Sequence, residues 1–259
     1  MKADTQEIPR DSGWRAGREF ARFATGLIPI FHFLFYCLVV GSLRAILLLG
    51  AKVRVVSFHK PPAGAFVMAS NHISHFDPPF LSGWFPRKID WIAMSELFGA
   101  GWSRTGFRWL DVIPVDRGGD DRQALREALR RLAAGRVIGV FPEGGIRDGE
   151  RSMVAGAPGR EGAVLLAVWA GCPIVPVVIL GSERLYNAKN WLPWRRARVY
   201  IAVGKPILPP EDKSRSAARE RMRNDLAAAI VRLKDDLVRE CGLSEKDLPH
   251  SPQERMAEP

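Results

Sequence analysis

The sequence predicts an α/β fold in which a largely parallel sheet is covered by helices, with an N-terminal apolar helical segment that binds a membrane. After residue 50, short runs rich in Val, Ile and Phe alternate with stretches of helical length, as in a parallel sheet. Before residue 50, the run 23–43 contains no Asp, Glu, Lys or Arg. We therefore expect a membrane-associating segment at 1–50, one large domain at 51–248, and a flexible tail at 249–259.

The N-terminal apolar run is just long enough to cross a bilayer as a helix, and a second apolar stretch follows Gly41. Two geometries stay open. The run forms either a single spanning helix or a bent pair of helices that lies in the interface and breaks near Pro29 or Gly41. Basic side chains suited to anchoring at an anionic headgroup layer are Arg15, Arg18, Arg22 and Arg44.

Seven short apolar runs bounded by Gly, Pro or Asp predict strands. They cover residues 52–58, 65–69, 91–93, 112–115, 137–141, 174–180 and 198–203. Three further stretches predict helices, at 120–134, 160–170 and 214–240. Functional groups of such sheets gather in the loops beyond the strand ends, so polar residues directly after strands are the first candidates for a site.

The chain carries a net charge of +10 and has a pI near 10.0, which indicates an anionic partner. No nucleic-acid-binding motif is present, and the apolar N-terminal run favours a lipid surface over nucleic acid. The three cysteines, Cys37, Cys172 and Cys241, are too widely spaced for a disulfide framework or a metal site. We expect a reducing compartment and no cofactor.

A histidine and a carboxylate follow the strand expected at 65–69: His72, and Asp77 five residues later. An imidazole takes a proton from a hydroxyl near neutral pH, and a carboxylate on its other ring nitrogen stabilises the imidazolium. The spacing also suits a loop histidine beside an Asp-Pro turn, or a metal site with His75 that would need a further ligand. No G-x-S-x-G nucleophile elbow is present.

Three further blocks follow in order: V-D-R ending at Arg117, F-P-E-G at 141–144, and V-P-V at 175–177. With the N-H-x-x-x-x-D block from Asn71 to Asp77, the sequence resembles the glycerolipid acyltransferases of the 1-acylglycerol-3-phosphate (lysophosphatidic acid) acyltransferase type. That family is marked by these four blocks in this order. The resemblance covers roughly residues 50–210.

The resemblance implies a role for each matching residue. His72 would be the general base that deprotonates the hydroxyl of an acceptor, and Asp77 would orient it. Arg117 would bind the phosphate of the acceptor, for which a planar guanidinium is suited. Glu143 and Gly144 would belong to the acceptor site. The hydroxyl would attack a fatty acyl thioester carried on coenzyme A or acyl carrier protein, without an acyl-enzyme.

The sequence departs from the family after F-P-E-G, where Thr and then Arg are common. Gly145 and Ile146 stand at those positions, and Arg147 follows one residue later. We assign Arg147 to substrate binding as well. The departure concerns the headgroup of the acceptor: lysophosphatidic acid, giving phosphatidic acid, is the first choice, and another lysolipid such as an aminolipid is the alternative.

A second hypothesis, from another class, is a catalytically silent protein that binds anionic membranes through its basic surface. The enzyme hypothesis implies membrane lipids and acyl-CoA or acyl carrier protein as partners, without nucleic acid. It also implies a location on the cytoplasmic face of the inner or plasma membrane.

Overall fold

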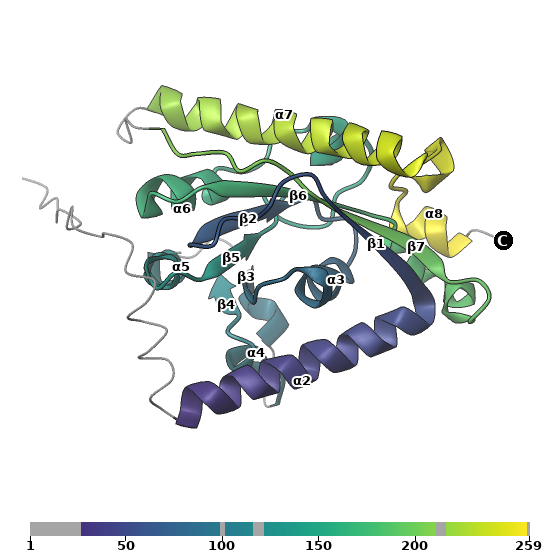
Figure 1. The fold of residues 1–259 in the computed structure, drawn as a ribbon, viewed down its shortest axis with the longest axis horizontal. Helices are drawn as coiled ribbons and strands as arrows, with labels where there is room; N and C mark the ends of the chain where they lie inside the picture. The colour runs from purple at the N-terminus through teal and green to yellow at the C-terminus, as the bar shows by residue number, and fades with distance from the viewer. Residues whose placement is uncertain (1–26, 99–101, 116–121, 211–215, 258–259) are drawn as a thin grey trace, which may run out of the picture.

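The computed structural model describes residues 27–98, 102–115, 122–210 and 216–257 (Figure 1). Its strands are β1 (Ala51–Ser57), β2 (Phe66–Ser70), β3 (Ile89–Met94), β4 (Ile113–Val115), β5 (Val137–Val140), β6 (Ile174–Leu180) and β7 (Ala197–Val203). They form one seven-stranded sheet in the order β1-β7-β6-β2-β5-β3-β4. Every neighbouring pair is parallel except β6 and β7, which are antiparallel. The predicted largely parallel α/β sheet is confirmed.

Each of the seven predicted strands is present, with bounds shifted by a few residues at most. The helices are α2 (Leu27–Gly50), α3 (Asp77–Trp84), α4 (Trp102–Trp109), α5 (Arg122–Ala133), α6 (Gly162–Ala170), α7 (Ser216–Cys241) and α8 (Pro252–Ala257). Of these, α5, α6 and α7 match predicted helices. The sequence did not predict α3, because Asp77-Pro78-Pro79 resembles a turn. Proline is tolerated in the first helical turn, where its missing N–H has no partner to lose.

Helices cover both faces of the sheet (Figure 1). On one face α5, α6 and α7 pack against the strands, and their buried residues include Leu132, Leu166 and Leu226. On the other face, Phe80 and Leu81 of α3 and Leu47 of α2 pack against alternate residues of the same strands. The sheet is therefore buried on both sides, as a parallel sheet requires.

The helix α2 is continuous from Leu27 to Gly50, so the bent pair of helices broken near Pro29 or Gly41 is wrong. Pro29 lies in the first turn, where it does not interrupt the hydrogen-bond ladder. Judged by length and composition, the segment Ile30–Gly50 of α2 could cross a membrane. The expected anchors Arg15, Arg18 and Arg22 lie outside the described residues.

One side of α2 packs on the domain, with Tyr36 and Leu47 buried. Arg44 lies over the ring of Trp84 at 5.1 Å, and Lys88 lies over that of Tyr36 at 4.9 Å. The other side exposes apolar side chains, namely Ile30, Phe31, Phe33, Leu34, Leu38, Ile46, Leu48 and Leu49. The helix thus has one protein-facing and one unpartnered apolar side among the described residues.

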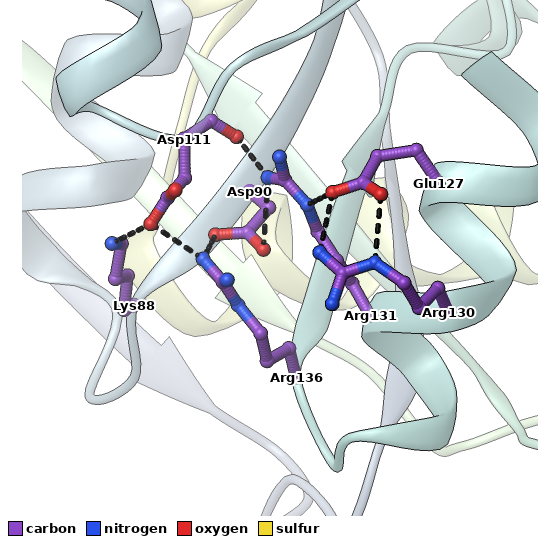
Figure 2. A network of polar contacts seen from close by, with 7 residues as sticks. All are labelled: Lys88, Asp90, Asp111, Glu127, Arg130, Arg131 and Arg136. Atoms are coloured by element: carbon purple, nitrogen blue, oxygen red, sulfur yellow. Dashed lines mark hydrogen bonds and ion pairs between the residues drawn. The ribbon is translucent and has the colours of Figure 1, made fainter. Parts of the chain in front are cut away.

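A network of buried charges joins the amino ends of β3, β4 and β5 (Figure 2). Arg136, which directly precedes β5, donates to Asp90 Oδ1 at 2.6 Å and to Asp111 Oδ2 at 2.7 Å. Arg131 of α5 lies 3.3 Å from the second oxygen of Asp90, and Lys88 donates to Asp111. These ion pairs fasten α5 to the sheet at the edge away from the strands' carboxyl ends.

In the tail expected to be flexible, the structure describes the helix α8 (Pro252–Ala257), which packs against the 3₁₀ helix η4 (Ser182–Tyr186). The preceding 3₁₀ helix η6 (Glu245–Asp247) is held by Arg184, which donates to Asp247 Oδ1 at 3.2 Å. The C-terminal segment therefore lies beside the segment that follows β6.

Candidate active site

His72 and Asp77 meet at the carboxyl end of β2. His72 follows the strand, and Asp77 begins α3, so the turn between them brings His72 Nδ1 within 2.8 Å of Asp77 Oδ2. The same oxygen accepts the backbone N–H groups of Ile73 at 2.8 Å and Ser74 at 2.9 Å. Asp77 is fully buried, and because a carboxylate only accepts, it holds the proton of the imidazole on Nδ1. The lone pair of the imidazole is then on Nε2.

The other oxygen of Asp77 is held by a residue that the sequence did not single out. Ser182, in η4 after β6, donates its hydroxyl to Asp77 Oδ1. Two further hydrogen bonds join the end of β2 to β6. The side-chain amide of Asn71 donates to the carbonyl of Ile179 and accepts the N–H of Ile179, each at 2.9 Å. Both oxygens of Asp77 therefore accept hydrogen bonds, from neutral donors and from the imidazole.

Glu143, just beyond β5, holds the backbone of His72. Its Oε2 accepts the His72 N–H at 2.7 Å. Its Oε1 accepts the Ser152 hydroxyl at 2.8 Å and the Met153 N–H at 2.6 Å. Burial raises the pKa of this carboxyl, although the three donors favour its charged form. Glu143 therefore anchors the backbone of His72, and its role in an acceptor site, which the resemblance implies, stays a prediction.

An aromatic stack supports the imidazole. The Phe141 ring lies against His72 with centroids 4.0 Å apart, and Trp91 lies on the far side of Phe141 at 4.9 Å. Trp91 in turn donates from Nε1 to Ser82 Oγ of α3 at 2.9 Å. The imidazole is consequently confined between a carboxylate at its edge and an apolar wall on its face, with only 15 % of its side chain exposed.

The loop after Glu143 passes close to His72. The N–H of Arg147 donates to the His72 carbonyl at 2.8 Å, so the backbone of Arg147 lies beside His72. Gly144 has φ of +68°, a left-handed conformation that favours glycine, and the guanidinium of Arg160 lies against it where a Cβ would be. Arg160 is a cation near the site that sequence reasoning missed. Arg117 lies outside the described residues.

His75 does not join His72 and Asp77 in a metal-ligand set. Its Nδ1 lies 2.5 Å from the hydroxyl of Tyr186, which also accepts the His75 N–H at 3.0 Å. Over the parts of the chain that the structure describes, no group of three or more His, Cys, Asp or Glu side chains is arranged to hold a metal ion. The geometry is that of one imidazole, His72, held in a fixed orientation by a carboxylate.

Comparison with known proteins gives a consistent result. The sequence model of the family described as Acyltransferase matches residues 52–180. A 1-acyl-sn-glycerol-3-phosphate acyltransferase of Bacillus subtilis is 27% identical over 197 residues, which are 75% of this chain and 93% of that protein. The human 1-acyl-sn-glycerol-3-phosphate acyltransferase alpha is 30% identical over 197 residues, covering 73% of this chain and 67% of that protein.

A solved structure has the same fold. The 1-acyl-sn-glycerophosphate acyltransferase PlsC from Thermotoga maritima superposes with a TM-score of 0.55 at 23% identity. The alignment covers 85% of this chain and 95% of that chain.

Proposed function

The chain belongs to the acyltransferase family, and from this membership we propose that it transfers a fatty acyl group from an acyl thioester to the hydroxyl of a lysophospholipid. The acceptor is 1-acylglycerol-3-phosphate and the product is phosphatidic acid. The names of the bacterial and human relatives support this acceptor. A catalytically silent protein would have no use for a buried carboxylate that orients an imidazole.

His72 acts as the general base. As the acceptor oxygen attacks the thioester carbonyl, its proton moves to Nε2, and the Asp77 carboxylate stabilises the resulting imidazolium through Nδ1. The C–O ester bond forms, the C–S bond breaks, and the imidazolium returns the proton to the leaving thiolate. No covalent enzyme intermediate and no cofactor are needed.

The observation that carries this proposal is the geometry of Asp77. A fully buried carboxylate that binds Nδ1 at 2.8 Å fixes the tautomer whose Nε2 can accept a proton. A loop histidine beside a simple Asp-Pro turn would not need a carboxylate surrounded by four donors.

The acceptor phosphate binds near the F-P-E-G block. This is supported by the backbone N–H of Arg147, which donates to the His72 carbonyl, and by Arg160, which lies against Gly144. Arg117 completes the site, as its block in the family implies. Guanidinium groups bind phosphate through parallel N–H donors, which favours a phosphate monoester over a neutral headgroup.

The donor is acyl-CoA or acyl carrier protein. Both are polyanions, which suits a chain of net charge +10. Since such thioesters are made in the cytoplasm, the enzyme works on the cytoplasmic face of the membrane. Residues 1–50 form the membrane-associating segment, and residues 51–248 form the acyltransferase domain.

The test is a screen of lysolipid acceptors with one acyl thioester, in which the release of free thiol is measured. We expect turnover with lysophosphatidic acid and little with lysophosphatidylethanolamine or lysophosphatidylcholine. His72→Ala removes the base and lowers turnover by about 10²- to 10⁴-fold. His59→Ala, in an exposed loop after β1, is the matched control and keeps wild-type turnover. Wild-type turnover in both His72→Ala and Asp77→Ala would disprove the mechanism.

A further inference from the structure

The loop 192–196 lies at the catalytic edge of the sheet. It joins the 3₁₀ helix η5 (Ala188–Trp191) to β7. Because β6 and β7 are antiparallel, β7 begins at the edge where β2, β5 and β6 end. The strand β1 runs parallel to β7 and therefore begins at this edge too, directly after α2. Loop 192–196, the end of α2 and His72 thus share one edge.

Contacts fix this loop between α2 and the catalytic turn. Arg196 donates from Nη1 to the carbonyl of Leu48 in the last turn of α2, at 3.2 Å. Gly50 packs so closely against Trp191 and Leu185 that a Cβ would lie 2.9 Å from each. On its other side, Trp191 lies 6.2 Å from the ring of Phe76, next to Asp77.

The loop exposes large apolar side chains. Trp194 is 78% exposed and Leu192 is 39% exposed. In the adjoining last turn of α2, Leu48 is 41% and Leu49 is 63% exposed. Exposed tryptophan beside exposed leucines is typical of a surface that enters the boundary between headgroups and acyl chains.

A cationic hollow lies directly behind the exposed loop. It has a volume of about 210 Å³ and is lined by Arg184, Asn190, Arg195, Arg196, Ala197, Arg198 and Asp247. Four arginines thus face one carboxylate, and that carboxylate is already bound by Arg184. Arg198 also stands next to Lys52 in the β1–β7 ladder. Adjacent like charges destabilise a sheet unless an anion lies near them.

Two of the arginines that line this hollow have a guanidinium N–H that lacks an acceptor. Nε of Arg184 and Nε of Arg196 are buried and make no hydrogen bond within the described part of the chain. A buried donor without an acceptor destabilises the fold, and an anion in the hollow would offset the positive charge of these two guanidinium groups. Phosphate oxygens suit several guanidinium donors at once.

We propose that loop 192–196 and the arginine-lined hollow behind it form a membrane contact separate from the outer side of α2. The hollow binds the phosphate of an anionic phospholipid headgroup, and Trp194 and Leu192 enter the bilayer beside it. This site is distinct from the one that binds the acceptor phosphate next to His72. It holds the catalytic edge toward the lipid layer that supplies the acceptor.

The apolar neighbours of the hollow decide between a bilayer and a soluble polyanion. A thioester carrier or a nucleic acid would use the arginines but would leave Trp194 and Leu192 in water. A phospholipid surface satisfies both groups, because its phosphates and acyl chains lie within one side-chain length of each other.

The first experiment measures binding of the full chain to vesicles, which requires no turnover. Vesicles of phosphatidylcholine alone are compared with vesicles that also contain phosphatidylglycerol. Arg195→Gln/Arg196→Gln is expected to weaken binding to the anionic vesicles by about 5-fold for each charge removed, with little change on phosphatidylcholine. Arg221→Gln/Arg232→Gln removes the same charge from the exposed side of α7, across the sheet, and is the matched control.

Circular dichroism and urea unfolding check that the double variant is folded, and the single variant Arg195→Gln avoids the bond to Leu48. His72→Ala is expected to bind vesicles like wild type, which separates this inference from the proposed chemistry. Equal loss of binding in the α7 control, or no loss in either loop variant, would overturn the proposal. So would a rise in the KM for the acyl thioester without a change in vesicle binding.

The second experiment locates Trp194. The emission of Trp194 is obtained by subtracting the fluorescence of Trp194→Phe from that of the wild-type protein. We expect lipids with brominated acyl chains to quench this emission. Trp169, on α6 and also partly exposed, supplies the control through Trp169→Phe. Its emission is expected to be unaffected, because α6 covers the opposite face of the sheet from α2 (Figure 1). Unquenched Trp194 emission in bound protein would overturn the insertion.

Discussion

Two clusters of buried or half-buried carboxylates lie at opposite ends of the parallel strands, and their hydrogen-bond and charge partners differ. At the carboxyl ends, Asp77 and Glu143 accept hydrogen bonds from backbone N–H groups, serine hydroxyls and the His72 imidazole. At the amino ends, Asp90 and Asp111 are paired with arginine and lysine (Figure 2). The first arrangement leaves negative charge beside the imidazole, whereas the second cancels it.

The pKa shifts follow this difference at Asp111 but not at Asp90, where burial raises the pKa of the carboxyl despite the nearby Arg136 and Arg131. Although burial opposes it, Arg136 and Lys88 hold the pKa of Asp111 below its usual value. Likewise, although burial opposes the charge of Arg136, Asp90 and Asp111 raise its pKa. At the other end, burial raises the pKa of Glu143, since no arginine or lysine is among its hydrogen-bond partners there. A carboxylate without a cation can stabilise a positive charge that appears only during a reaction; a paired one cannot.

The sharpest test of this contrast is Asp77→Asn. The amide can neither fix the His72 tautomer nor accept all the donors that surround Asp77. We expect turnover to fall by about 10³- to 10⁴-fold. Asp111→Asn is the matched change at the other end, and Asn tolerates the φ of +60° there. It should keep turnover within a few-fold in thiol-release assays. Comparable losses in both variants would abolish the distinction between the clusters.

Asp90→Asn should affect stability rather than chemistry. It removes a fully buried partner of Arg136 and Arg131 and leaves their charges partly uncompensated. We expect a loss of about 3 kcal/mol in the free energy of unfolding, measured by urea titration, with wild-type turnover in the folded fraction. Asp235→Asn, at an exposed pair on α7, should change it by less than about 0.5 kcal/mol.

A smaller effect is expected for Ser182→Ala, which removes one donor from Asp77. A hydrogen bond to a charged group contributes about 1.5–3 kcal/mol, so turnover should fall by about 10- to 100-fold. The KM for the acceptor should not change, because Ser182 acts through Asp77. Ser182→Thr keeps the hydroxyl and should restore much of the activity. Ser57→Ala, at the exposed end of β1, is the control and should keep wild-type turnover. If Ser182→Ala is as active as this control, Ser182 does not position the Asp77 carboxylate.

The smallest effect concerns pH and the outer rim of the network at the amino ends. Arg130, with Arg131, lowers the pKa of Glu127 from 4.5 to about 2, against the effect of burial. The stability from a depressed pKa is present above pH 4.5 and is lost as the pH falls through about 2. Glu127→Gln should therefore be less stable at neutral pH by less than about 1 kcal/mol. The difference in unfolding free energy between Glu127→Gln and the wild type should vanish below pH about 2. A difference that persists there would contradict the assignment of this stability to the Glu127 carboxylate.

The strands were predictable because each is a short apolar run that ends in Gly, Pro or a polar residue. The spacing of His72 and Asp77 predicted their meeting at a strand end, and the structure brings them together. What the sequence could not show was long-range partnership. Ser182 is 105 positions from Asp77, and the Glu143 carboxylate reaches a backbone N–H 71 positions away. The sequence around Ser182 or around Glu143 does not indicate which distant residue each one contacts.

The charge network at the amino ends was equally hidden. Asp90 lies inside a strand, where an acidic residue is unfavourable, and its cations come from α5 and from the residue before β5. The helix α2 was predicted as apolar, and whether it breaks at Gly41 stayed open; in the structure it is continuous and contacts α3. The partners of Asp90 come from elements distant in the sequence, so its own strand does not reveal them.

The reversal of β1 and β7 has a consequence for how this enzyme searches for its substrate. Leu48 and Arg196 are 148 positions apart, yet both belong to the rim on which His72 stands, because their strands start where the others stop. A wholly parallel sheet would have put attachment and chemistry at opposite poles of the domain. With the membrane contact and the base proposed above, an acceptor diffusing in the plane of the bilayer would need only to cross this rim, so its encounter with His72 would be a search in two dimensions.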